Sequence, residues 1–260
     1  MRLRLRFRIP PPVDFILETK GLRKEFKGFV AVNGVDLRVS RGSIHALIGP
    51  NGAGKTTVFN LLTRFLPATA GRIVFKGENI THEHPAHVAR RGMARSFQIS
   101  AVFPNLTVLE NVRIALQRRL GTSFQFWRAE RTLEVLDARA LELLDAVGLS
   151  EFHRRVAVEL PYGRKRALEI ATTLALEPEL LLLDEPTSGL GHEDVGRVTA
   201  LIRKVAEGRT VLMVEHNLSI VSELADRITV LARGSVLSEG TYGEVSSDPA
   251  VREAYLGGSP

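Results

Sequence analysis

The apolar and polar positions divide the chain into regions of different texture. Between residues 15 and 37 apolar positions alternate loosely with polar ones, which predicts short strands. From about residue 87 to 160 the apolar spacing becomes helical, and from residue 164 onward short apolar runs alternate with helical segments. Alternating strands and helices indicate a mostly parallel sheet that is covered on its faces. We therefore expect an α/β fold with an antiparallel β region near the N-terminus and an inserted helical subdomain.

The lengths of the runs predict the individual elements. Strands are expected over 44–48, 180–183, 210–214 and 228–231, and helices over 56–65, 111–119, 130–147, 164–176, 195–206 and 218–225. The stretch 121–128, which holds the only tryptophan, Trp127, is expected to be an inserted loop. In the helix over 130–147 a buried stripe is expected to contain Leu133, Leu136, Leu141, Leu144 and Val147. The predicted layout is a basic tail over 1–13 and one domain over 14–260, with a core over about 14–87 and 166–260 and a helical subdomain over about 88–165.

The composition argues against several kinds of site and partner. The chain has 260 residues, 44% of them hydrophobic, and no cysteine, which excludes disulfides, thiolate metal sites and cysteine nucleophiles. Its formal charge is +6, and four of the positive charges are Arg2, Arg4, Arg6 and Arg8 in the tail. We interpret this tail as solvated, with a weak contact to anionic lipid as the alternative. The rest of the chain is nearly neutral, so no nucleic-acid partner is expected, and no run of 18 apolar residues predicts a membrane span.

A glycine-rich loop gives the strongest chemical signal. It matches the phosphate-loop pattern GxxxxGK[ST] between a predicted strand and a predicted helix, the context in which that pattern binds nucleotide phosphates. Glycines let backbone N–H groups converge, and the following helix adds its positive end. Lys55 is predicted to reach the β- and γ-phosphates, and Thr56 to hold Mg²⁺. The candidate nucleotide-binding residues here are Gly49, Pro50, Asn51, Gly52, Ala53, Gly54, Lys55, Thr56 and Thr57.

Two carboxylates follow a second buried strand. The apolar run 180–183 ends in Asp184 and Glu185, at the strand edge where ligands bind in α/β sheets. Asp184 is predicted to hold Mg²⁺, and Glu185 to act as the general base that polarises the attacking water.

With these two motifs the chain resembles the ATPases of ABC transporters, over about residues 17–257. The resemblance implies ATP and Mg²⁺ as ligands. It implies that Gln98 senses the γ-phosphate and the metal, that His216 contacts the γ-phosphate, and that Phe26 stacks on adenine. For Phe26 the alternative is an ordinary core phenylalanine. The segment 188–191 takes the place of the D-loop, with Gly191 where an acidic or amide residue is common.

The signature motif of that family, usually LSGGQ, is only partly matched. Its place is taken by Leu160, Pro161, Tyr162, Gly163 and Arg164. Pro161 replaces a serine whose hydroxyl donates to the γ-phosphate held by the opposite subunit, and Arg164 replaces a glutamine. Backbone N–H groups at the helix start still suit an anion, so one donor is weakened rather than the site abolished.

The tyrosine-glycine signature, the insertion near Trp127 and the ending Tyr255-Leu256-Gly257 resemble the branched-chain amino acid importer ATPases. That resemblance implies a place at the cytoplasmic face of the inner membrane. The implied partners are permeases, a second ATPase subunit (a heterodimer is favoured over a homodimer) and, indirectly, an extracytoplasmic binding protein. The alternatives are a urea or amide importer, a lipopolysaccharide-export ATPase, and a soluble ABC ATPase acting on ribosomes or nucleic acid.

Three histidines, His82, His84 and His87, form a second cluster of possible ligands. Because Pro85 is expected to interrupt any helix and no further ligand group is evident nearby, we interpret this stretch as a solvated loop.

Overall fold

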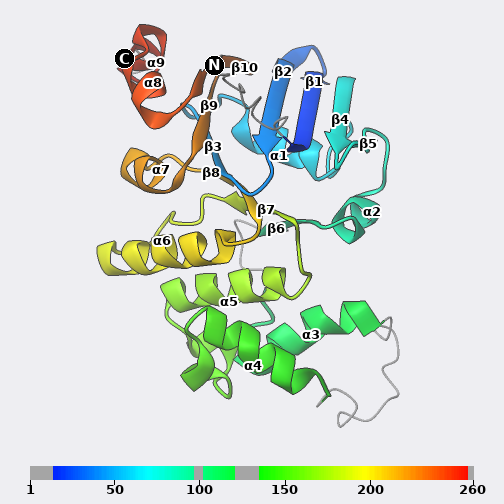
Figure 1. The fold of residues 1–260 in the computed structure, drawn as a ribbon, viewed down its shortest axis with the longest axis vertical. Helices are drawn as coiled ribbons and strands as arrows, with labels where there is room; N and C mark the ends of the chain where they lie inside the picture. The colour runs from blue at the N-terminus through cyan, green and yellow to red at the C-terminus, as the bar shows by residue number, and fades with distance from the viewer. Residues whose placement is uncertain (1–13, 97–101, 121–134, 257–260) are drawn as a thin grey trace, which may run out of the picture.

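The structure is a computed structural model that describes residues 14–96, 102–120 and 135–256. The strands are β1 (Phe15–Phe26), β2 (Phe29–Ser40), β3 (Ile44–Ile48), β4 (Ala70–Phe75), β5 (Glu78–Asn79), β6 (Met93–Ser96), β7 (Leu180–Asp184), β8 (Thr210–Val214), β9 (Arg227–Ala232) and β10 (Ser235–Gly240). The helices are α1 (Lys55–Leu62), α2 (Pro85–Arg90), α3 (Val108–Leu120), α4 (Asp137–Ala146), α5 (Tyr162–Leu174), α6 (His192–Ala206), α7 (Leu218–Leu224), α8 (Tyr242–Ser247) and α9 (Pro249–Leu256). Figure 1 shows the strands gathered in one half of the molecule and α3, α4 and α5 in the other.

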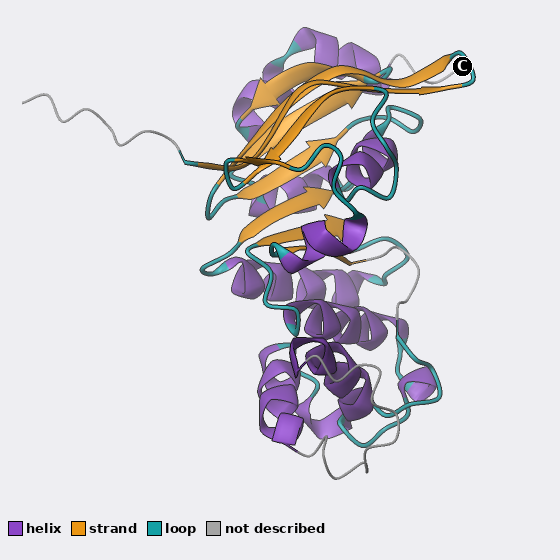
Figure 2. Cartoon of the chain, turned by 90° about the vertical axis from the view of Figure 1, so that its right-hand side faces the viewer, coloured by secondary structure: helices purple, strands orange, loops and turns teal. Residues whose placement is uncertain are grey.

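The strands form two sheets. The four-stranded sheet is antiparallel with the order β2-β1-β4-β5, and the six-stranded sheet has the order β10-β9-β3-β8-β7-β6. All pairs of the larger sheet are parallel except β9 with β10. Figure 2 shows the parallel strands of this sheet running in a common direction above the helical layers. The expected α/β class is confirmed, as is the antiparallel β region near the N-terminus.

The N-terminal strands are longer than the loose alternation predicted. β1 and β2 each contain 12 residues and form one hairpin. Its two-residue turn, Lys27 and Gly28, has positive φ at both positions, 46° and 90°, the geometry that matches the twist of the flanking strands. Several register shifts interrupt the pairing. These bulges break the strict period of two, which is why the sequence indicated short pieces.

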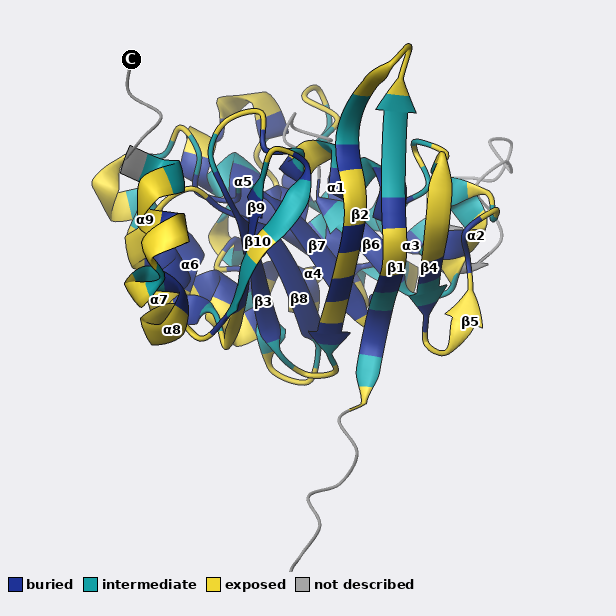
Figure 3. Cartoon of the chain, turned by 90° about the horizontal axis from the view of Figure 1, so that it is seen from above, coloured by how far each residue is buried: buried dark blue, intermediate teal, exposed yellow. Residues whose placement is uncertain are grey.

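Two apolar clusters cover the two faces of the larger sheet. One contains Phe59, Leu61 and Leu62 of α1 and lies between the sheets. The other joins the opposite face to the helices α3 to α7. In Figure 3 the central strands β3, β8 and β7 are almost entirely dark blue, and this complete burial is expected of parallel strands with both faces covered.

Two local expectations were wrong. Leu141 does not belong to the buried stripe of α4, because its side chain is 39% exposed, whereas Leu144 is fully buried. Pro85 begins α2 instead of interrupting a helix, since a proline in the first turn has no N–H to lose. His84 caps that helix, and its Nδ1 accepts from the N–H of Ala86 at 3.3 Å.

The division into subdomains stays a prediction. β6 falls inside the range 88–165, yet it pairs with β7 in the larger sheet, so sheet structure continues beyond residue 88. The basic tail, the insertion with Trp127, Leu133 and Gln98 lie outside the described residues.

Candidate active site

The loop from Gly49 to Gly54 joins β3 to α1 and has the geometry of a phosphate loop. Its three glycines Gly49, Gly52 and Gly54 have φ values of 149°, 78° and 101°, a region that side-chain-bearing residues rarely adopt. At Gly49 an added Cβ would lie 2.1 Å from the carbonyl oxygen of Leu231 on the neighbouring strand. Glycine is therefore required at this position by space as well as by backbone conformation.

Lys55 gives the loop its charge. Its ammonium donates to the carbonyl oxygens of Gly49 at 2.7 Å and Pro50 at 3.0 Å, so the side chain folds back over the loop. Burial lowers the pKa of Lys55, and the negative charges of Glu185 and Asp184 oppose that shift. α1 has no acidic residue in its first turn and no side-chain cap, which leaves its positive end available. A cation and a free helix N-terminus in one concave loop suit a polyphosphate.

Asp184 stands at the end of β7, and its side chain is buried. Its carboxylate forms an ion pair with Arg95 of β6. Arg95 also donates to the side-chain oxygen of Asn60 on α1 at 2.6 Å. Thr56, at the start of α1, is exposed, and its hydroxyl is the second predicted Mg²⁺ ligand. A carboxylate and a hydroxyl are oxygen donors of the kind that Mg²⁺ prefers, so these residues fit the metal.

Glu185 has an unusual backbone conformation. Its φ is 44°, in the left-handed region, which costs a non-glycine residue free energy and often marks a functional position. Its N–H donates to the carbonyl of Val214 at 2.9 Å, which ties the residue to the end of β8. The side chain is half-buried and close enough to Lys55 to raise that group's pKa. The sequence indicated the carboxylate but not this turn.

His216 follows β8 and is exposed, so its ring is accessible to a ligand. The residue before it, Glu215, is fully buried. The Glu215 carboxylate accepts from the N–H of Thr187 at 3.1 Å and from its hydroxyl, and also from the N–H of His216 at 3.1 Å. Glu215 thus joins the turn after β7 to the turn after β8. We missed it at the sequence level, although a carboxylate directly before the histidine was visible.

The structure brings these groups to one edge. β3, β8 and β7 are adjacent and parallel, so the loop after β3, the carboxylates after β7 and the histidine after β8 emerge at the same side of the sheet. Ligands of α/β sheets bind at this carboxyl edge.

The signature segment lies instead at the start of α5. Leu160 is buried, Pro161 occupies the N-cap position with φ −56°, and Tyr162 is half-exposed. An added Cβ at Gly163 would lie 2.5 Å from the Asp194 carboxyl carbon. Arg164 does not point toward the sheet edge, because its guanidinium lies 3.7 Å above the ring of Phe152. Gly191 of the D-loop segment is the N-cap residue of α6.

Phe26 is not a core residue. It ends β1 at the tip of the hairpin, and its side chain is 41% exposed. The ammonium of Lys24 lies 4.9 Å from the centre of its ring. An exposed aromatic face of this kind is available for stacking.

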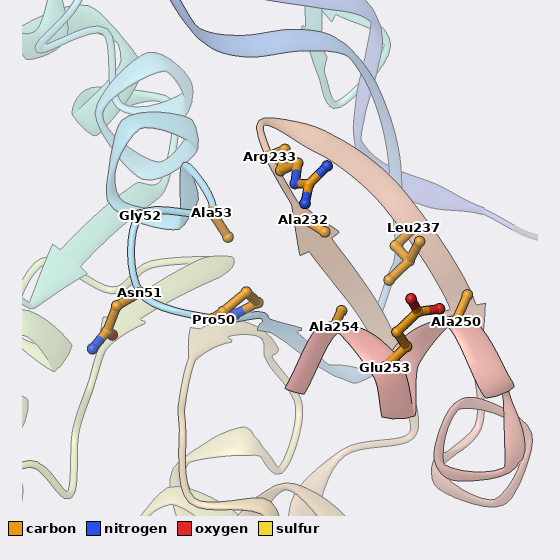
Figure 4. Close-up of a pocket in the computed structure, with 10 residues that line it drawn as sticks. All are labelled: Pro50, Asn51, Gly52, Ala53, Ala232, Arg233, Leu237, Ala250, Glu253 and Ala254. Atoms are coloured by element: carbon orange, nitrogen blue, oxygen red, sulfur yellow. The ribbon is translucent and has the colours of Figure 1, made fainter. Parts of the chain in front are cut away.

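A cavity of about 610 Å³ lies beside the loop, between it and the C-terminal helix α9 (Figure 4). Its lining residues are Pro50, Asn51, Gly52, Ala53, Ala232, Arg233, Leu237, Ala250, Glu253 and Ala254. Tyr255 of α9 reaches the beginning of the same loop. Burial raises the pKa of Tyr255 to about 12, while the N–H of Gly49 beside its hydroxyl acts in the opposite direction.

Comparison with known proteins agrees with this geometry. Residues 32–188 match the family model described as ABC transporter, and the chain belongs to this family of ATP-hydrolysing cassettes. Residues 235–259 match a second model, described as branched-chain amino acid ATP-binding cassette transporter, and this match assigns the chain to that branch of the family.

Individual relatives are similar over nearly their whole length. The chain is 41% identical to the branched-chain amino acid transport ATP-binding protein BraF of Pseudomonas aeruginosa, over 93% of this chain and 98% of that protein. It is 38% identical to LivG of Escherichia coli, with the same coverage.

Solved structures give the same result. An ATP-binding cassette of an ABC transporter in its ADP conformation superposes with a TM-score of 0.83 at 33% identity, over 94% of this chain and 99% of that one. A nucleotide-free cassette superposes with a TM-score of 0.81 at 31% identity, over 93% and 98%. Within the described part of the chain, no helix is both long and apolar enough to cross a bilayer.

Proposed function

We propose that this chain hydrolyses ATP to drive the import of branched-chain amino acids through separate membrane permeases. The observation that carries the proposal is the convergence of Lys55, Asp184 and Glu185 at the carboxyl ends of the parallel strands β3 and β7, which flank β8, in a chain of this family. The cargo is inferred from the relatives BraF and LivG, which are branched-chain amino acid transport ATP-binding proteins, and from the C-terminal family match.

Each site residue has a defined part in this scheme. Lys55 and the backbone N–H groups of the loop hold the β- and γ-phosphates of ATP. Thr56, Asp184 and Gln98 hold Mg²⁺, which neutralises charge on the transferred phosphoryl group when bound. Glu185 accepts a proton from the attacking water, and His216 contacts the γ-phosphate.

The signature segment serves the ATP of a second subunit. It lies at the N-terminus of α5 and not in the loops that follow β3, β7 and β8, and a partner ATPase supplies the nucleotide that it meets. The N–H groups at the start of α5 suit a phosphate of that partner's nucleotide. Phe26, exposed at the hairpin tip, stacks on adenine.

Two exposed apolar side chains support docking to a permease at the cytoplasmic face of the membrane. Phe103 is 51% and Val158 54% exposed, and the N–H of Val158 donates to the carbonyl of Pro104 at 2.9 Å, so the two chain segments lie side by side. Phe103 closely follows the segment that holds Gln98. Contact with a permease would remove the apolar surface of these two side chains from water, which favours association.

The test is to purify the tagged chain from gently solubilised membranes of its native host and to identify its partners by mass spectrometry. Two permeases, a second ATPase and an amino-acid binding protein are the expected partners. ATP-dependent uptake of leucine, isoleucine and valine by vesicles that contain the purified complex would establish the cargo. Uptake of urea or an amide instead would replace the cargo. Recovery with ribosomes and no permease would overturn the transport role and leave the ATPase chemistry standing.

A further inference from the structure

The two carbonyl groups that flank Glu185 are held by one side chain. Arg166, in the second turn of α5, donates from Nη2 to the carbonyl of Asp184 at 2.7 Å and from Nε to the carbonyl of Pro186 at 3.2 Å. One planar guanidinium therefore bridges the peptide unit that precedes Glu185 and the peptide unit that joins Pro186 to Thr187. Because its donors have a fixed relative geometry, this contact restrains the backbone on both sides of the residue.

Arg166 is itself held in one orientation. The residue is 5% exposed, and its third nitrogen, Nη1, donates to the carboxylate of Glu169 at 2.6 Å. Glu169 is equally buried, so the pair brings no net charge into the interior. A buried ion pair of this kind is weak evidence for stability, because desolvation offsets most of the attraction. We therefore assign the pair of Arg166 and Glu169 a role in fixing geometry.

That geometry concerns the strained residue between the two carbonyls. Glu185 has φ 44°, and its N–H is bound to Val214. Left-handed backbone at a non-glycine residue persists only where the surroundings determine it. Arg166 supplies this restraint at the peptide unit before Glu185 and at the unit that joins Pro186 to Thr187, and Glu215 accepts from the N–H of that second unit.

We propose that Arg166 is a positioning residue for the general base, and that it links α5, the helix of the signature segment, to Glu185 of the same chain. The proposal rests on the assignment of Glu185 as base under the proposed function. It adds that the position of the base depends on a side chain 19 residues earlier, so a shift of α5 reaches Glu185 directly through two hydrogen bonds.

The test uses the full-length chain and two variants. The first is the double variant Arg166→Gln with Glu169→Gln, which removes both charges together and leaves no lone buried ion. The second is Arg166→Lys, which keeps the charge but loses the planar fork. We expect kcat for ATP hydrolysis to fall about 10- to 100-fold in both, since small displacements of a catalytic group have effects of this size. The KM for ATP should stay within about twofold of the parent value, because the phosphate loop is untouched.

The matched control is Arg113→Lys. Arg113 also uses two nitrogens to pair with a carboxylate, that of Asp137, but in the contact between α3 and α4. It should leave kcat within about twofold. An equal loss of kcat in this control would overturn the proposal, because the effect would then belong to the packing of the helices.

A second arm repeats the Arg166 variants in the Glu185→Gln background and measures single-turnover rates. If Arg166 acts only by positioning Glu185, its replacement should lower the single-turnover rate by less than about twofold once Glu185 has been replaced. The same fold loss in both backgrounds would overturn the positioning role alone. Normal turnover in Glu185→Gln by itself would overturn the base assignment of the proposed function, and with it this inference.

Discussion

The guanidinium of Arg95 lies against the carboxylate of Asp184, and both side chains are almost completely shielded from solvent. Arg95 comes from β6, and the same guanidinium reaches Asn60 of α1. The carboxylate proposed for Mg²⁺ is thus oriented by a cation of the protein. The contact also joins three elements, since β6, β7 and α1 meet at this pair.

Replacement of Arg95 by glutamine should destabilise the protein by about 3–5 kcal/mol, because Asp184 would be left buried without its countercharge. The expected measurement is a lower midpoint of thermal unfolding, which Mg²⁺ with ATP should partly restore by supplying another cation. The control is Arg91→Gln, whose ion pairs with Glu78 and Glu83 are more exposed, so its loss should lower the unfolding midpoint much less. Equal shifts for Arg95→Gln and Arg91→Gln would contradict the role of burial.

Lys55→Ala should abolish ATP hydrolysis, because the loop loses the cation that reaches the phosphates.

Glu185→Gln should slow hydrolysis by about 10²- to 10⁴-fold while nucleotide binding is kept, the range expected when a general base is removed. In this glutamine variant the ATP-bound dimer should accumulate and be visible as a dimer peak by light scattering in ATP. A variant with normal turnover and no trapped dimer would remove Glu185 from the role of base.

The free energy of unfolding should decrease as the pH is lowered, because His45 is buried in β3. Its Nε2 lies 2.8 Å from the Thr229 hydroxyl, which donates onward to Glu239, so Nε2 carries the proton of the neutral ring. Burial lowers the pKa of His45 to about 4; the charge of Glu239 opposes this shift and that of Arg227 adds to it.

The unfolded chain takes up this proton near pH 6.5, and the folded chain only near pH 4. The folded state therefore loses stability as the pH falls through that window. Between pH 7 and pH 5 the loss from His45 is about 2 kcal/mol. Urea unfolding at pH 7 and pH 5 measures this loss of stability. In His45→Gln, which has no imidazole to titrate, the free energy of unfolding should fall by about 2 kcal/mol less than in the parent protein. The same pH dependence in both proteins would disprove the assignment.

Pro161→Ser should keep or raise ATPase activity, because it returns a hydroxyl to the signature segment. Serine is also favoured at the N-cap, the position of Pro161 in α5, and gains about 0.5–2 kcal/mol there. The lost rigidity of proline offsets about 0.4–1 kcal/mol of that gain, so the unfolding temperature should change little. ATPase rate and ATP-driven dimerisation are the measurements, and loss of dimerisation would count against this account.

The local motifs could be predicted from sequence, and the contacts between them could not. The phosphate loop around Lys55 and the carboxylates after β7 depend on residues adjacent in the chain, so their spacing was sufficient. The contacts of Arg166 and Glu215 could not be predicted, because their partners are 18 to 28 positions away and depend on how α5 and β8 pack against β7. Leu141 shows the same limit, since an apolar residue at helical spacing faces solvent when no neighbour covers it.

The closeness of α9 to the phosphate loop has a consequence for how the protein is made. The loop at Gly49 leaves the ribosome well before Glu253 and Ala254, which wall the cavity beside it. The surroundings of the loop are therefore completed only after α9 has been translated. A chain truncated before Pro249 would retain every nucleotide-site motif and still lack one side of the space around the loop, so gene fragments that contain all the motifs do not encode the whole site.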